Sequence, residues 1–286
     1  MINLLPFATL SITNEAVQQS PGSNLWDDIM KLLNEQLPQY LNGAYKTIML
    51  AVIATAIGCV IGLFCGILQT LHYSKNDFIL KKIIIWIVRI IVRIYVEVFR
   101  GTPMILQAVF IFYGIPYITN NAFRLDVIPA AYVIVSINTG AYMAETVRGG
   151  ILSIDNGQTE GAMSIGMNHV QTMLKVILPQ TIRNIIPQIG NNLIINIKDT
   201  SVMFIIGYAE LFAAHKAYVG QSYLYFPSAV VTMAMYLIMT IACSLLLRLW
   251  EHLMDGPENF DLATKDQLAL TSGMNNFPKG RGRRSR

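Results

Sequence analysis

The sequence has little charge. Asp, Glu, Lys and Arg make up 13% of its 286 residues, about half of the roughly 25% found in ordinary soluble domains. Hydrophobic residues make up 53%, and a soluble protein of this length would need charges over its whole surface. Most of the chain is therefore expected to lie in lipid, as helices of about 20 mostly apolar residues each.

Catalytic and metal-binding motifs are also missing. The sequence has no GxxxxGK[ST] phosphate loop, no HExxH and no GxSxG, so we expect no ATP binding of the phosphate-loop kind and no hydrolase or zinc centre. Its four histidines are far apart in sequence. Cys59, Cys65 and Cys243 have the spacing of neither a zinc site nor a disulfide framework. We therefore expect no enzyme activity, no metal and no cofactor in this chain.

The apolar stretches predict an all-α integral membrane protein with about five core spans. These cover residues 44–71, 83–118, 128–151, 180–206 and 227–250. The second stretch is interrupted at Thr102-Pro103, a pair typical of a helix restart with threonine as N-cap and proline at the first helical position. Gly58, Gly62 and Gly66 lie on one face of the first span and predict close packing against another helix.

Three regions are expected along the chain: an extracytoplasmic N-terminal extension at 1–42, a transmembrane domain at 43–254 and a cytoplasmic basic tail at 255–286. The first 12 residues are apolar but lack the basic start of a cleavable signal peptide. The polar residues that follow include a short amphipathic helix expected around 25–37. The tail ends in a basic run, 279–286, that we expect near anionic lipid rather than nucleic acid.

Lysine and arginine predict the orientation, because they are retained on the cytoplasmic side. One set of loops, span ends and the tail holds Lys75, Lys81, Lys82, Arg89, Arg93, Arg148, Lys175, Arg183, Arg248, Lys265, Lys279, Arg281, Arg283, Arg284 and Arg286. The opposite set holds only Lys31, Lys46, Arg124 and Lys216. The N-terminus is therefore predicted outside and the C-terminus in the cytoplasm.

The cytoplasmic loop 153–179 is more than a polar turn. Residues 158–165 predict a short helix that Gly166 can end. Two short helices at an angle would form a compact knob, and its small side chains would fit a groove on a partner protein. An amphipathic loop on the membrane surface is the alternative that these residues leave open.

The second helix of this loop has its own start signal. Asn168 is followed by Gln171 in capping-box spacing. Pro179 is expected to stop this helix and to begin the next span.

The same loop carries a resemblance to a known family. Glu160-Gly161-Ala162, followed by Gly166, Val176 and Leu178-Pro179, resembles the EAA loop of ABC importer permeases of type I. The family has alanine at the place of Gly161, and a glycine there loosens the helix by about 1 kcal/mol. The resemblance implies that residues 158–179 dock into a cleft on a separate ATPase subunit. The ATPase-coupling residues that it implies are Glu160, Gly161, Ala162 and Gly166.

The resemblance extends over residues 41–253, where the sequence is similar to the polar amino-acid branch of this family. It is carried by Arg100-Gly101-Thr102-Pro103 with Gln107, by Asn138-Thr139-Gly140-Ala141-Tyr142-Met143-Ala144-Glu145 with Arg148-Gly149-Gly150-Ile151, by Leu178-Pro179-Gln180 with Arg183, Pro187 and Asn191 or Asn192, and by Lys198-Asp199-Thr200-Ser201. It implies a non-catalytic permease subunit in the bacterial plasma (inner) membrane. The implied partners are ABC ATPase subunits that bind the ATP, a second copy or a sibling permease, and an extracytoplasmic solute-binding protein.

Polar residues inside membrane spans are costly and usually face a cavity or one another. The candidate substrate-pathway residues are Gln107, Asn138, Tyr142, Glu145, Asn192, Lys198 and Asp199. Glu145 or Asp199 could hold the ammonium group of an amino acid. Asn138, Asn192 or Lys198 could hold its carboxylate. Structural pairing of Lys198 with Asp199, and of Glu145 with Arg148, is the alternative reading.

Two other functions compete with an amino-acid permease. One is an ABC permease for another small solute, which ligand binding by the receptor would reveal. The other is a stand-alone secondary carrier, which would transport without an ATPase. Such carriers often contain internal repeats, and none is visible in this sequence.

Overall fold

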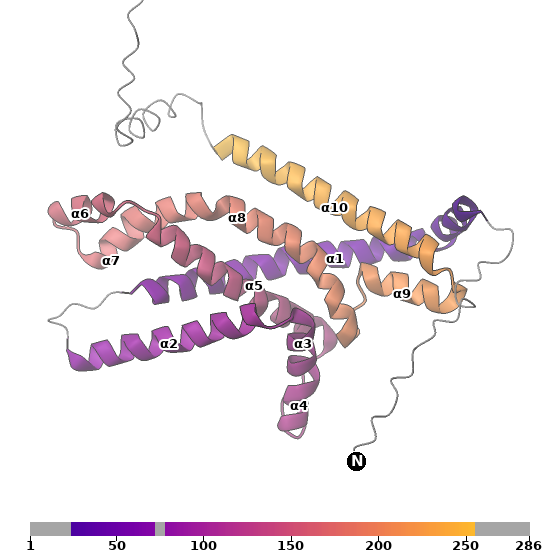
Figure 1. Cartoon of the computed structure of the whole chain (residues 1–286), viewed down its shortest axis with the longest axis horizontal. Coiled ribbons are helices and arrows are strands. Elements are labelled where there is room, and N and C mark those ends of the chain that lie inside the picture. Colours follow the sequence, from indigo (N-terminus) through magenta and orange to yellow (C-terminus); the bar gives the residue numbers. More distant parts are fainter. Residues whose placement is uncertain (1–23, 72–77, 255–286) are drawn as a thin grey trace, which may run out of the picture. The chain divides into compact units, whose positions relative to one another are not determined.

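The computed structural model describes residues 24–71 and 78–254, and all regular elements in these two ranges are helices. Figure 1 shows their arrangement. The predicted all-α class is therefore confirmed. The chain divides into two compact units, Met1–Leu245 and Leu246–Arg286.

The helical elements follow the predicted order. They are α1 (Leu25–Thr70), α2 (Ile79–Gly101), α3 (Met104–Val109), the π-helical turn η2 (Phe110–Gly114), α4 (Ile115–Ile118), α5 (Val127–Leu152), α6 (Asn156–Ser164), α7 (His169–Thr172), the π-helical turn η3 (Met173–Ile177), α8 (Leu178–Asp199), the 3-10 helix η4 (Thr200–Ile206), α9 (Leu211–Ser222) and α10 (Tyr225–Met254).

Several of these helices can cross a membrane. Within the described residues, α1, α5 and Tyr225–Trp250 of α10 are long and apolar enough, and His169–Ile206 together with α9 forms a further candidate bent by 51°. Helix α2 has 23 residues, or about 34 Å at 1.5 Å per residue, against a hydrocarbon core of about 30 Å. Its lysines and arginines make it less apolar than α1, α5 and α10. The fold has about five core spans, supplied by α1, α2, α5, α8 with η4, and α10.

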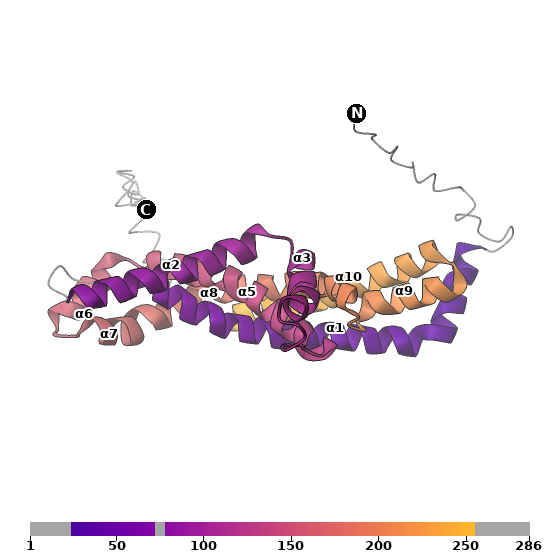
Figure 2. The ribbon, with the colours of Figure 1, turned by 90° about the horizontal axis from the view of Figure 1, so that it is seen from below.

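Helix α1 differs from its prediction at the start. We expected a separate amphipathic helix around 25–37 and a first span from residue 44, but a single helix of 46 residues begins at Leu25 and runs through Pro38. Its first turns point away from the rest of the helix in both views (Figures 1 and 2). Proline removes one backbone hydrogen bond and bends a helix without having to end it.

The break at Thr102-Pro103 exists, but its capping is not the predicted one. Thr102 closes α2, and its Oγ1 donates to the carbonyl of Val98 at 2.7 Å. Pro103 is the N-cap residue and α3 begins at Met104. The following α3–η2–α4 stretch turns sharply away from α2 (Figures 1 and 2). Residues 83–118 therefore form two helical segments of different direction, not one interrupted span.

The glycines of α1 pack against α5. A Cβ atom on Gly58 would lie 2.7 Å from Cβ of Thr139, and one on Gly66 would lie 2.6 Å from Cγ1 of Val147. Each distance is shorter than real side chains allow, so the two backbones approach closely because the glycines have no side chains. The helix partner that the glycine spacing could not identify is thus α5.

The two ends of this bundle carry different elements. Helices α6 and α7 lie at the end where α2 begins, and α9 lies at the opposite end (Figures 1 and 2). Buried Leu32, Tyr40, Leu211 and Tyr218 form an apolar cluster that joins α1 to α9. The loop with the EAA resemblance and α9, which contains Lys216 of the set predicted on the opposite side, therefore lie at opposite ends of the bundle.

Candidate functional site

The loop 153–179 folds into the predicted pair of short helices. Helix α6 begins behind Asp155, whose Oδ1 accepts from the Gly157 backbone N–H at 2.6 Å. At its end, the N–H of Gly166 donates to Met163 O and the N–H of Met167 donates to Ala162 O, which is a Schellman motif. Gly166 has φ +85°, a left-handed conformation that favours glycine. The predicted role of Gly166 as helix terminator is confirmed.

The second helix has the predicted capping box. Asn168 Oδ1 accepts from the Gln171 backbone N–H at 2.9 Å, and Gln171 Oε1 accepts from the Asn168 N–H at 2.9 Å. The predicted stop at Pro179 is wrong, since α7, η3 and α8 follow one another without an interruption. Proline cannot donate the next backbone bond, and the wider π-helical turn just before it keeps the helical path continuous.

The coupling residues differ in exposure. Glu160, Gly161 and Gly166 are exposed, whereas Ala162 is buried. No atom lies within 4 Å of a Cβ placed on Gly161 or Gly166. Behind this surface is a pocket of about 410 Å³ that reaches from Thr70 at the end of α1 to Glu160. The knob therefore presents a carboxylate beside two positions without side chains.

Gln107 and Asn138 meet and hold the bend after α2. Asn138 Nδ2 donates to Gln107 Oε1 at 2.9 Å, and Gln107 Nε2 donates to the carbonyls of Phe99 and Thr102, each at 2.9 Å. Both side chains are buried. These two predicted pathway residues thus satisfy backbone groups at the break and join it to α5.

The asparagines of α8 are also engaged inside the bundle. Asn192 Nδ2 donates to Gln188 O at 3.0 Å and to Met143 Sδ at 3.4 Å. Asn196 Nδ2 donates to Thr55 Oγ1 at 2.7 Å and so connects α8 with α1. Both asparagines are buried, so they hold helices together in this structure.

Tyr142, Glu145 and Arg148 form a partly exposed cluster with Arg100. Glu145 Oε1 accepts from Arg148 Nη1 at 2.9 Å, and its Oε2 lies 3.7 Å from Arg100 Nη1. The guanidinium carbon of Arg100 is 5.6 Å from the centre of the Tyr142 ring. The structural pairing of Glu145 with Arg148 is therefore present. The partner from α2, Arg100, is one that sequence reasoning did not assign to this carboxylate.

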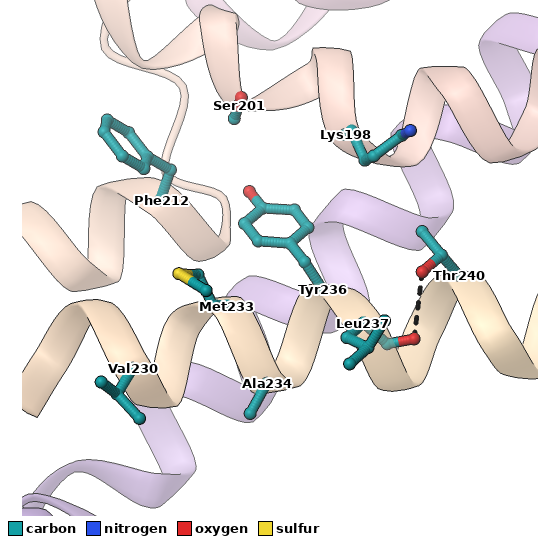
Figure 3. A pocket seen from close by; sticks show the side chains of 9 residues that line it. All are labelled: Lys198, Ser201, Phe212, Val230, Met233, Ala234, Tyr236, Leu237 and Thr240. Carbon is teal, nitrogen blue, oxygen red and sulfur yellow. Dashed lines mark hydrogen bonds between the residues drawn. The ribbon is translucent and has the colours of Figure 1, made fainter.

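Lys198 and Asp199 are exposed and form no ion pair with each other in the described part of the chain. Lys198 lines a pocket of about 630 Å³ between α8, η4, α9 and α10. Figure 3 shows Lys198 and Thr240 at one end of this pocket and Phe212 and Val230 at the other. The Tyr236 ring projects into it. The pocket is mainly apolar, with one ammonium group and a few hydroxyl groups at its wall.

Glu210 is a buried carboxylate that is not among the residues predicted for the site. Its Oε2 accepts from Tyr236 Oη at 2.6 Å and from Thr47 Oγ1 at 3.2 Å, and its Oε1 accepts from the Ala213 N–H at 3.0 Å. It is 1% exposed and is the N-cap residue of α9. A single acidic residue before an apolar helix was the available signal. Its contacts with α1 and α10 cross too much sequence to be predicted.

A family model matches this chain over residues 84–256. The family is described as the inner membrane component of binding-protein-dependent transport systems. The match includes α5, the loop 153–179, α8 and the pocket at Lys198. It thus contains all the predicted coupling and pathway residues.

Relatives and solved structures agree with this match. The chain is 35% identical over 218 residues to the glutamine transport system permease protein GlnP of Escherichia coli (strain K12), covering 76% of this chain and 94% of the relative. It is 32% identical over 176 residues to the arginine transport system permease protein ArtQ of Bacillus subtilis (strain 168), covering 62% and 74%. A crystal structure of an amino acid ABC transporter with histidines matches with a TM-score of 0.68 and 30% identity, covering 82% of this chain and all of the other.

A structure of the MetNI methionine ABC transporter in an inward-facing conformation is similar in fold. Its TM-score is 0.57 at 20% identity, and the match covers 76% of this chain and 94% of that chain.

Proposed function

Because the chain belongs to the family of binding-protein-dependent transport system inner membrane components, we propose that its loop 158–179 couples it to a separate ATPase. The chain is the non-catalytic, membrane-spanning permease subunit of an ABC importer for polar amino acids. It is a multi-pass protein of the inner membrane. ATPase and solute-binding proteins are the general partners of this family.

The observation that carries the coupling proposal is the geometry of α6 and α7. The Schellman motif at Gly166 and the capping box at Asn168 fix the two short helices into a knob. Its exposed surface presents Glu160 and Gly161. A carboxylate next to small residues suits close approach of a partner backbone with a cationic side chain facing Glu160. We assign ATP binding to that partner and no cofactor to this chain.

The assembly and orientation belong to the same proposal. A second permease, either another copy or a sibling, completes the membrane domain. The N-terminus lies outside and the C-terminus in the cytoplasm, because the lysines and arginines gather at the end of the spans that carries α6 and α7. We divide the chain into an extracytoplasmic extension (residues 1–42), a permease domain (residues 43–254) and a basic cytoplasmic tail (residues 255–286). Helix α1 crosses the first boundary without a break.

The proposed substrate path uses two kinds of polar residue. The exposed or partly exposed ones are Tyr142, Glu145, Lys198 and Asp199, which a passing amino acid can reach. The buried ones are Gln107, Asn138 and Asn192, which position α3, α5 and α8 behind that surface. Opening and closing of the path would follow from movement of the knob when the ATPase binds ATP.

The experiment is a pull-down of the tagged chain from detergent-solubilised membranes, together with the other subunits of its transport system. Wild type is compared with Glu160→Arg and Gly166→Asp, and Gly161→Ala is the matched control because a Cβ there meets open space. We expect a nucleotide-binding ATPase subunit to co-purify with wild type and with the control, and to be lost from the other two. Retention of the ATPase by both Glu160→Arg and Gly166→Asp would overturn the assignment of the loop.

A further inference from the structure

Helix α9 is tied to the rest of the bundle by a buried chain of three polar side chains. His215 Nδ1 lies 2.7 Å from Ser228 Oγ, and Ser228 Oγ lies 2.6 Å from Tyr40 Oη. The chain thus runs from α9 through α10 to α1, and each of its members is at most 2% exposed. Histidine is the side chain whose ordinary pKa is closest to neutral pH. A group that can titrate therefore lies inside the contact between three helices.

The backbone at both ends of α9 makes this contact important. Gly207, at the end of η4, has φ +85°, and Tyr223, at the end of α9, has φ +58°. Both are left-handed conformations that interrupt a helical path, and α9 is bent by 51° from the helical stretch before it. Side-chain contacts, rather than a continuous helix, therefore hold α9 against α1 and α10 (Figure 1).

The hydrogen-bond chain suits a neutral imidazole. A neutral His215 can accept at Nδ1 from the Ser228 hydroxyl, which in turn accepts from Tyr40 Oη, so both hydroxyl protons are used. Nδ1 of a protonated ring can only donate, and the Ser228 proton must then find another acceptor. Protonation would also place a full charge on a side chain that is 2% exposed, which is costly.

The charges around His215 also oppose its protonation. Lys216 Nζ lies 5.5 Å and 5.4 Å from the ring centres of Phe212 and Tyr225, and the His215 ring contacts the same two rings. The carboxylate of Glu210 is occupied by its own hydroxyl and backbone donors. Burial first, and then Lys216, lower the pKa of His215 from its ordinary value of 6.5. The titratable groups at this contact are Lys216, Tyr218 and Glu210 of α9, Tyr40 of α1, and Tyr225 and Tyr236 of α10.

We propose that the His215–Ser228–Tyr40 chain is an acid-sensitive latch: neutral His215 holds α9 against α1 and α10, and its protonation from the outside releases α9 and slows uptake. Because the pKa of His215 is lowered in the latched state, the stabilisation is complete above about pH 6.5 and is lost as the pH falls from there through the lowered pKa. Helix α9 leads from η4 to α10, so its release uncouples the outer ends of two spans. The effect on uptake rests on the proposed function, whereas the latch itself does not.

The first test measures the opening of α9 by thiol labelling of the complete importer in nanodiscs, with Cys59, Cys65 and Cys243 replaced by alanine. Ala214→Cys lies on the buried face of α9, and Gln221→Cys at an exposed position is the matched control for the effect of pH on the thiol itself. Between about pH 7.5 and about pH 5, we expect maleimide labelling at position 214, relative to position 221, to rise severalfold. His215→Gln keeps a hydrogen-bonding side chain that does not titrate, and its relative labelling should stay low. No rise in the parent protein, or the same rise in His215→Gln, would overturn the latch.

A second variant decides the case in which His215→Gln labels rapidly at both pH values because glutamine fails to hold α9. Lys216→Gln removes the nearby cation, so the midpoint of the labelling rise should move to higher pH. A midpoint that stays in place or moves to lower pH would contradict control by the charge of His215.

Uptake by proteoliposomes with a buffered interior, internal ATP and the solute-binding protein tests the regulation. Acidifying the outside should slow uptake severalfold with wild type and not with His215→Gln, and equal slowing of both would overturn the regulatory role. Failure of the proposed function has a different sign: no ATP-dependent uptake at any pH, whatever the pH dependence of labelling.

Discussion

Gly166 is the residue on which the shape of the coupling loop depends most directly. It adopts φ +85° between α6 and α7, where a Cβ atom costs roughly 1–2 kcal/mol. We predict that Gly166→Ala lowers ATP-driven uptake several-fold, because the strain changes the angle between the two helices that meet the ATPase. The measurement is uptake of the labelled substrate by proteoliposomes containing the complete importer.

The control for this prediction lies in the same loop. Gly161 is helical and exposed, and a Cβ there has no atom within 4 Å. Gly161→Ala should leave uptake intact and stabilise α6 by up to about 1 kcal/mol. If both substitutions had the same effect on uptake, the backbone conformation of Gly166 would not be the cause.

At the scale of residues, the features that the sequence predicted correctly are those that depend only on neighbouring residues. Gly166 and the pair Asn168 and Gln171 act within a few residues of themselves, so their spacing is enough to predict a terminator and a capping box. The Arg100 contact with Glu145 joins two helices and was not predicted. The prediction that Thr102 is the N-cap residue of α3 was wrong, because its hydroxyl donates to the Val98 carbonyl at the end of α2 and Pro103 is the N-cap residue.

At the scale of elements, the contact between α1 and α5 depends on Gly62. A Cβ atom on Gly62 would overlap Met143 and lie 2.8 Å from the backbone nitrogen of Ala144. Because backbone atoms cannot move aside cheaply in a packed helix pair, we predict that Gly62→Ala destabilises the protein by roughly 1–3 kcal/mol. Thermal unfolding of the detergent-purified chain measures this as a lower transition temperature. Gly149→Ala, on α5 with no atom within 4 Å, should not lower it, because alanine also favours the helix.

The hydrogen bonds of Glu210 tie α1, α9 and α10 together. Tyr236 and Thr47 both donate to its Oε2, so removing one donor leaves a buried carboxylate partly unsatisfied. We predict that Tyr236→Phe costs roughly 1–3 kcal/mol of stability. Thr47→Val should cost a similar amount, because it removes the donor to Glu210 and also the acceptor of the buried Leu211 N–H at 3.3 Å. A double-mutant cycle of unfolding free energies should give a coupling above about 0.5 kcal/mol. Simple additivity would show that Tyr236 and Thr47 do not act through Glu210.

Helix boundaries illustrate what periodicity can and cannot predict. Apolar stretches identified the spans because membrane helices need a minimum apolar length. Pro179 was read as the stop of a helix, and a short helix was predicted around residues 25–37, just before Pro38, yet both prolines lie within continuous helical stretches. Proline removes one hydrogen bond, and its effect then depends on packing: a bend in α1, and a π-helical turn before α8. Packing partners such as α5 for the glycines of α1 are likewise absent from local sequence.

At the scale of the whole molecule, membrane orientation sets the function of each end. The family resemblance correctly indicated the fold and the amino-acid permease class, because several motifs occur in the right order over most of the chain. Orientation instead follows from the distribution of lysine and arginine. It predicts that α6 and α7 face the cytoplasm, where the proposed ATPase could reach them, and that α9 faces the outside.

This orientation predicts a labelling pattern. Ser164→Cys places a thiol at an exposed position of α6, and Gln221→Cys places one at an exposed position of α9, in a background where Cys59, Cys65 and Cys243 are replaced by alanine. A membrane-impermeant maleimide added to spheroplasts should label Gln221→Cys and not Ser164→Cys. Inside-out vesicles should give the reverse. If spheroplasts labelled Ser164→Cys instead, the coupling loop would face away from cytoplasmic ATP. The orientation predicted from lysine and arginine would then be wrong.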